Sequence, residues 1–149
     1  MRHLLLLAAL AIPALAAAPG ARAQSSLADW QPPSRGMPAM PQMAELRGGW
    51  GAGAWQGAIA QVSGIGAEQT RAAGETSGGS ARARFVRFTG GYRPAATWTD
   101  RNGDGTADLI EIFRDGARVV QLVDADYDGT ANVLRVYSAS GQLLRETQL

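Results

Sequence analysis

The C-terminal half of the 149-residue chain alternates between short apolar runs and turn residues in a way typical of β-structure. Six runs rich in β-branched, aromatic and other apolar residues follow one another: 84–88, 95–99, 109–113, 118–123, 132–137 and 142–148. The pair Asp115-Gly116 between two of these runs is a typical hairpin turn. We therefore predict a mostly β domain over 81–149, built as a small antiparallel meander.

The stretch 24–80 lacks this pattern and is interrupted by Pro and Gly. Such a composition buries little apolar surface for each residue that is ordered. We predict a low-complexity, partly disordered, flexible segment, in which 56–73 is open to a short helix or a strand. Trp30, Trp50 and Trp55 are exceptions. We expect them to dock the segment onto the β domain, and contact with a partner is the alternative.

Residues 1–23 have the layout of a secretory signal peptide. Arg2 and His3 precede an apolar stretch from Leu4 to Ala18, and Ala21-Arg22-Ala23 forms a small-x-small cleavage site. The apolar stretch is short for a bilayer span, which takes about 20 residues. We predict export to the periplasm or the medium, with no membrane span after cleavage.

Composition removes several classes of enzyme. All 14 basic residues are Arg, Cys is absent, and the one His is His3. Without Lys, Cys or a retained His, the mature chain cannot build a Schiff-base lysine, a Cys or Ser-His-Asp nucleophile, or a His/Cys zinc site. The acids outside the loops described next carry no recognisable hydrolase motif, and the near-neutral charge gives no reason to expect nucleic acid. We predict a protein that is not an enzyme, and a hydrolase that uses paired carboxylates is the less favoured alternative.

Two acidic loops share the pattern D-x-[DN]-x-D-G-T-A-[DN] and start 24 residues apart. We name 100–108 loop 1 and 124–132 loop 2. Their positions 1, 3, 5, 7 and 9 are Asp100, Asn102, Asp104, Thr106 and Asp108 in loop 1, and Asp124, Asp126, Asp128, Thr130 and Asn132 in loop 2. Ca2+ takes 6–8 oxygen ligands, and this spacing lets side chains at positions 1, 3, 5 and 9 converge with the backbone carbonyl of position 7. Gly at position 6 permits the sharp turn. The repeat therefore predicts two Ca2+ sites.

Loop 1 also carries Glu111 at position 12, which completes an EF-hand pattern and adds a candidate ligand. Loop 2 has Arg135 at that position, and the 12 residues 112–123 leave little room for two helices between the loops. Strands fit the flanks better than helices. Residues 98–149 resemble the calcium-loop repeats of bacterial exported proteins, of FG-GAP/VCBS type or with EF-hand-like loops. The resemblance implies Ca2+ binding at positions 1, 3, 5, 7 and 9 of each loop.

In a meander, alternate connections emerge at the same end of the sheet. We therefore expect the two loops side by side, about 10 Å apart, which is two strand spacings. The sequence as a whole predicts calcium binding by an exported protein, in which the ion stabilises a β-repeat domain. The alternative is an adhesion or assembly module that presents a Ca2+-stiffened sheet to a protein partner or to a second copy. Met37, Met40 and Met43 raise Cu(I) binding as a minor alternative, although extended chain would hold them about 9 Å apart.

Overall fold

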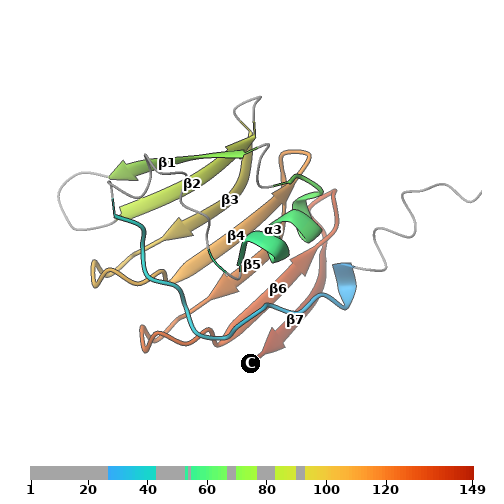
Figure 1. Cartoon of the computed structure of the whole chain (residues 1–149). Coiled ribbons are helices and arrows are strands. Elements are labelled where there is room, and N and C mark those ends of the chain that lie inside the picture. Colours follow the sequence, from blue (N-terminus) through green and yellow to red (C-terminus); the bar gives the residue numbers. More distant parts are fainter. Residues whose placement is uncertain (1–26, 43–52, 54, 67–69, 77–82, 90–92) are drawn as a thin grey trace, which may run out of the picture.

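A computed structural model describes residues 27–42, 53, 55–66, 70–76, 83–89 and 93–149 (Figure 1). Seven strands form one antiparallel sheet, and their order across the sheet is their order along the chain. The strands are β1 (Thr70–Thr76), β2 (Ala83–Thr89), β3 (Pro94–Thr99), β4 (Leu109–Arg114), β5 (Ala117–Val123), β6 (Val133–Tyr137) and β7 (Leu143–Gln148). The prediction of a mostly β antiparallel meander is confirmed. The proposed signal peptide lies outside the described residues.

The stretch 56–73, for which the sequence allows a helix or a strand, overlaps one of each. Helix α3 covers Trp55–Ser63, and it buries Trp55, Ile59 and Val62, whose spacing of four and three places them on one face. Strand β1 follows and pairs with β2 along its whole length, from Thr70 opposite Thr89 to Thr76 opposite Ala83. The sequence of β1 has Ala as its only apolar residue type, so it gives a weak strand signal.

One face of the sheet is apolar and forms the core with α3. A cross-strand row of Trp98, Ile110, Leu122 and Leu134 runs from β3 to β6, and all four side chains are fully buried. Figure 1 shows α3 lying across this face of the sheet. The helix and the row belong to a single cluster of buried apolar residues, so the folded domain has one continuous core.

The opposite face carries a polar row, because side chains alternate between faces along each strand. Thr97, Glu111, Gln121, Arg135 and Glu146 stand opposite one another on β3 to β7. Neighbouring side chains of this row form hydrogen bonds. Thr97 Oγ1 donates to Glu111 at 3.3 Å, Arg135 Nη1 donates to Gln121 at 3.1 Å, and Arg135 Nε donates to Glu146 at 2.7 Å. The row satisfies its polar groups across five strands.

Residues 27–42, which we name the strap, begin beside β7 and then pass along the end of the sheet where loops 1 and 2 lie (Figure 1). Leu27, Trp30, Met37 and Met40 are buried in the same core cluster as the sheet. Trp30 and Trp55 therefore dock their segments as expected, and Trp50 lies outside the described residues. Met37 and Met40 pack as core residues, which leaves neither thioether as a surface copper ligand, and Met43 lies outside the described part.

Candidate metal site

Loop 1 connects β3 to β4 and loop 2 connects β5 to β6, so both lie at the same end of the sheet, as the meander prediction requires. They are in direct contact, because the N–H of Asp124 donates to the carbonyl of Asp108 at 2.8 Å. The Arg101 guanidinium of loop 1 also donates to the carbonyl of Asp124 at 2.6 Å. The strand ladder thus continues from one loop to the other at their bases.

The first residue of each loop holds the loop closed in the same way. Asp100 accepts the N–H of Gly103 at 2.6 Å and that of Gly105 at 2.9 Å, one on each carboxylate oxygen. Asp124 accepts those of Tyr127 and Gly129, both at 2.8 Å. Both Asp side chains are almost fully buried, so the loops wind tightly around a carboxylate.

Positions 4 and 6 turn the chain with positive φ in both loops. At position 6, Gly105 and Gly129 have φ of 90° and 84°. A side chain at such a φ is strained, which explains the shared Gly. Position 4 is Gly103 in loop 1 but Tyr127 in loop 2, at a φ of 63°. The guanidinium of Arg101 lies 5.1 Å from the centre of the Tyr127 ring, and this contact helps to hold the less favourable conformation.

Position 5 is also equivalent in the two loops. Asp104 and Asp128 each accept, at 2.7 Å, the N–H of the Thr two residues later in the chain. At position 9, an oxygen of Asn132 accepts the N–H of Ala125 at 3.1 Å, and Asp108 accepts the N–H of Arg101 in the corresponding place. The internal similarity of the two sequences thus extends to the hydrogen bonds that shape the loops.

The loops differ in how their carboxylates meet. In loop 2, carboxylate oxygens of Asp124, Asp126 and Asp128 lie within 4.8 Å of one another, and no other such group of three occurs in the described part of the chain. In loop 1 the third position is Asn102, whose amide donates to Asp104 at 2.8 Å. Loop 2 is therefore the stronger candidate for a cation.

The pKa values follow this difference. The hydrogen bond from Asn102, together with the N–H of Thr106, lowers the pKa of Asp104. The pKa of Asp126 is instead raised, first by a hydrogen bond with Asp124, then by partial desolvation and by the negative charge of Asp128. Loop 2 thus concentrates negative charge that a cation would neutralise.

Glu111 lies on the polar face of the sheet, away from the arrangement that an EF-hand would need. Its carboxylate accepts hydrogen bonds from Thr97, Arg118 and Gln121 at 3.1 to 3.3 Å. It is not among the acids that converge in loop 2. Strands on both sides of each loop also replace the helices of an EF-hand.

Two features of the site could not be found from sequence patterns. Arg101 occupies a variable position of the loop motif, so nothing in the motif indicates that it joins the loops. The strap meets both loops through its backbone, with isolated bridges between Gly36 and Thr130 and between Ala39 and Thr106. Backbone pairing leaves little trace in residue types.

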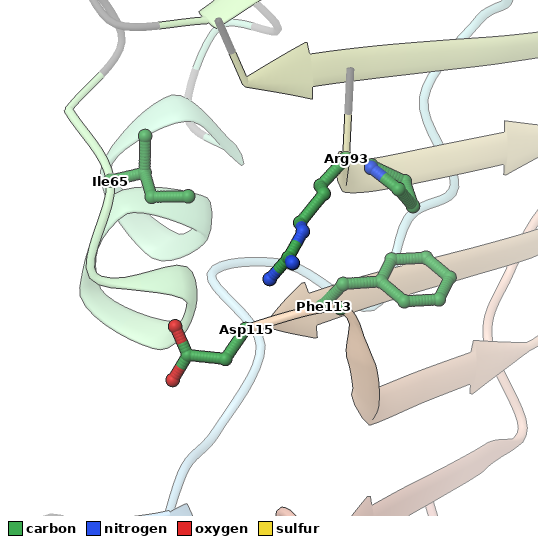
Figure 2. Close-up of a pocket in the computed structure, with 6 residues that line it drawn as sticks. Ile65, Arg93, Phe113 and Asp115 are labelled. Atoms are coloured by element: carbon green, nitrogen blue, oxygen red, sulfur yellow. The ribbon is translucent and has the colours of Figure 1, made fainter. Parts of the chain in front are cut away.

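A pocket lies at the other end of the sheet, beside the Asp115-Gly116 turn. It is lined by Ile65, Arg93, Pro94, Phe113, Asp115 and Gly116. Figure 2 shows Arg93 reaching from the start of β3 toward the turn that carries Asp115. This lining contains one carboxylate and no nucleophilic side chain, so it does not supply the paired acids or the triad of a hydrolase.

A scan against protein-family models, a search of curated proteins and a search of solved structures each gave no match. In the described residues, no helix has the length and apolar character needed to cross a bilayer.

Proposed function

We propose that this protein binds Ca2+ in loops 1 and 2, and that the ions stabilise the β domain of an exported protein. The observation that carries the proposal is the convergence of Asp124, Asp126 and Asp128 within 4.8 Å on one tightly wound loop. Three carboxylates at this separation repel one another, and a dication removes that repulsion. Export would place the loops in contact with extracytoplasmic calcium, where weak sites are useful.

The proposed ligands of loop 2 are the carboxylates of Asp124, Asp126 and Asp128, the carbonyl of Thr130 and the side chain of Asn132. Asn132 already lies next to the cluster, because its amide donates to Asp126 at 3.0 Å. The larger Ca2+ ion suits such a flexible, all-oxygen site better than Mg2+, which demands six close ligands in octahedral geometry.

Loop 1 would bind a second ion more weakly. It has Asn102 where loop 2 has Asp126, and Asp108 already accepts two backbone N–H groups, from Arg101 and Asn102. We leave Glu111 out of the proposed ligand set because both of its oxygens are engaged on the polar face of the sheet. The strand-flanked loops favour a structural ion over the opening motion of a helix–loop–helix sensor.

Calcium calorimetry on matched Asp→Asn variants tests the proposal. Asp128→Asn should abolish the tighter binding event, and Asp104→Asn should abolish the weaker one, while Asn keeps an acceptor for the N–H that each Asp binds. Asp115→Asn is the control, because it makes the same charge change at the opposite end of the sheet and Asn tolerates the φ of 51° there. Wild-type protein that gives no binding heat with millimolar Ca2+ contradicts the proposal.

A second candidate function is adhesion or assembly through the stiffened sheet. The observation that favours it is the edge strand β7, on which Leu143 and Leu144 are 48% and 42% exposed. Trp30 and Trp55 do not support it, because both are buried in the core. Molecular mass by light scattering, with Ca2+ and with EGTA, tests this candidate. A monomer in both conditions argues against self-assembly.

A further inference from the structure

We propose that the strap is a calcium-dependent latch, whose docking and the occupancy of loops 1 and 2 stabilise each other. This inference rests on the proposed calcium binding. It adds a regulated element, residues 27–42, that is not part of the loop motif. The contacts of the strap with the two loops carry the inference.

The strap pairs with both loops at equivalent positions. The N–H of Met37 donates to the carbonyl of Gly129 at 2.9 Å, and the N–H of Ala131 donates to the carbonyl of Arg35 at 2.7 Å. Three residues further along the strap, the N–H of Met40 donates to the carbonyl of Gly105 at 2.8 Å. The N–H of Ala107 completes the second pair by donating to the carbonyl of Pro38 at 2.9 Å. Positions 6 and 8 of each loop are thus fixed by the strap.

This pairing bears directly on position 7, the residue whose carbonyl is a proposed ligand. Successive carbonyls of an extended chain point in opposite directions. Because position 6 directs its carbonyl at the strap, position 7 directs its carbonyl the other way, toward the loop. A docked strap therefore holds the carbonyls of Thr106 and Thr130 in place before an ion arrives, which reduces the ordering that binding requires.

The same contacts anchor the strap in the core. Met37 and Met40, three residues apart, are 8% and 9% exposed, and Trp30 is 4% exposed. Gly36 and Ala39, each of which directly precedes one of these Met residues, are exposed. The side chains and the backbone of the strap thus dock as one unit, and loss of the loop geometry would release the apolar anchors together.

Loop charge supplies the switch. Mutual repulsion among Asp124, Asp126 and Asp128 disfavours the tightly wound loop that pairs with Met37 and Arg35. Bound Ca2+ removes that repulsion, so it favours the wound loop and the docked strap together. Linkage requires that the factor by which a docked strap tightens Ca2+ binding equals the factor by which Ca2+ favours docking.

Amide hydrogen exchange of the full-length protein, with Ca2+ and with EGTA, measures the latch. We expect exchange in peptides covering 27–42 to slow at least tenfold with Ca2+. Calorimetry on three strap variants then measures the reverse effect. Met40→Pro removes the N–H that binds Gly105, Met40→Ala removes the side chain but keeps that N–H, and Ala39→Pro introduces Pro at an exposed site whose neighbours make the bonds to the loop.

Met40 pairs with loop 1, so the affinity compared is that of the loop 1 site. We expect this affinity to be at least tenfold lower for Met40→Pro than for Met40→Ala, and within twofold of wild type for Ala39→Pro. If calorimetry shows Ca2+ binding but exchange in the strap is the same with and without Ca2+, the latch is wrong and the proposed function stands. The latch is equally wrong if Met40→Pro and Met40→Ala bind Ca2+ alike. If wild-type protein gives no Ca2+ binding at all, the proposed function and the latch both fail.

Discussion

Replacing Asp124 with Ala separates the structural and metal-binding roles of loop 2. The Asp124 side chain accepts the N–H groups of Tyr127 and Gly129, both at 2.8 Å, and the residue is 1% exposed. Its removal leaves two backbone donors without partners even when no metal is present. An unsatisfied buried group costs about 1–3 kcal/mol.

The size of the loss in unfolding free energy depends on how far water can replace the carboxylate as an acceptor for the two N–H groups. The exposed side chain of Tyr127 lets water reach that part of the loop, which reduces the cost there. We therefore expect Asp124→Ala to lower the free energy of unfolding in EGTA by about 2–4 kcal/mol. At Ca2+ a hundredfold above Kd, the wild type gains about 2.7 kcal/mol from binding, and the variant loses this gain as well.

Urea unfolding followed by Trp fluorescence, in EGTA and in Ca2+, measures both effects. Asp126→Asn is the matched control, because Asp126 is exposed and accepts the side-chain amide of Asn132, whereas Asp124 closes the loop by accepting the N–H groups of Tyr127 and Gly129. It should keep wild-type stability in EGTA, or exceed it, and still lose most of the calcium gain. Unchanged stability of Asp124→Ala in EGTA, or a full calcium gain in Asp126→Asn, would refute the reasoning.

Three further predictions concern pH, the core and the contact between the loops. As pH falls through the raised pKa of Asp126, protons compete with Ca2+, so affinity should fall and binding should release protons, which calorimetry in two buffers of different ionisation enthalpy detects. In EGTA the free energy of unfolding depends on pH in the opposite direction. Protonated Asp126 relieves repulsion, so its stabilising contribution is present at low pH and is lost as pH rises through that pKa. Trp98→Ala removes a fully buried core side chain and should lower the free energy of unfolding by about 3–5 kcal/mol in a urea titration. Arg101→Gln removes the guanidinium that binds the Asp124 carbonyl, so calorimetry should show tighter Ca2+ binding while stability in EGTA falls by about 1–3 kcal/mol. An unchanged affinity would show that the charge of Arg101 does not act on loop 2.

The strands from β3 to β6 could be predicted because each carries apolar residues that it buries, and the Asp115-Gly116 pair marks the turn between β4 and β5. Strands β2 and β7 could be predicted from the apolar runs in their sequences. Strand β1 could not be predicted, because its sequence TRAAGET has no large apolar residue and it forms by pairing with β2. A single sequence carries little information about such a partner-dependent strand.

The loop geometry at positions 1, 5 and 6 also follows from residue type, since Asp and Gly have specific roles in tight turns. The position of the strap does not. Its N–H and carbonyl groups make the bonds to Gly105 and Gly129, and any residue except Pro could supply the donors at positions 37 and 40. The sequence of the strap therefore resembles that of a Pro-rich linker, although its backbone binds both loops.

A calcium titration followed by two-dimensional amide NMR tests the central claim most directly, because it reports both whether Ca2+ binds and where. The account predicts that millimolar Ca2+ shifts the amide resonances of loops 1 and 2 first, above all those of Gly105 and Gly129, whose N–H groups bind the first Asp of each loop. Resonances of the turn at Asp115-Gly116, at the far end of the sheet, should stay in place. A spectrum in which the loop resonances do not move, or in which the shifts occur elsewhere in the domain, would contradict calcium binding at these loops.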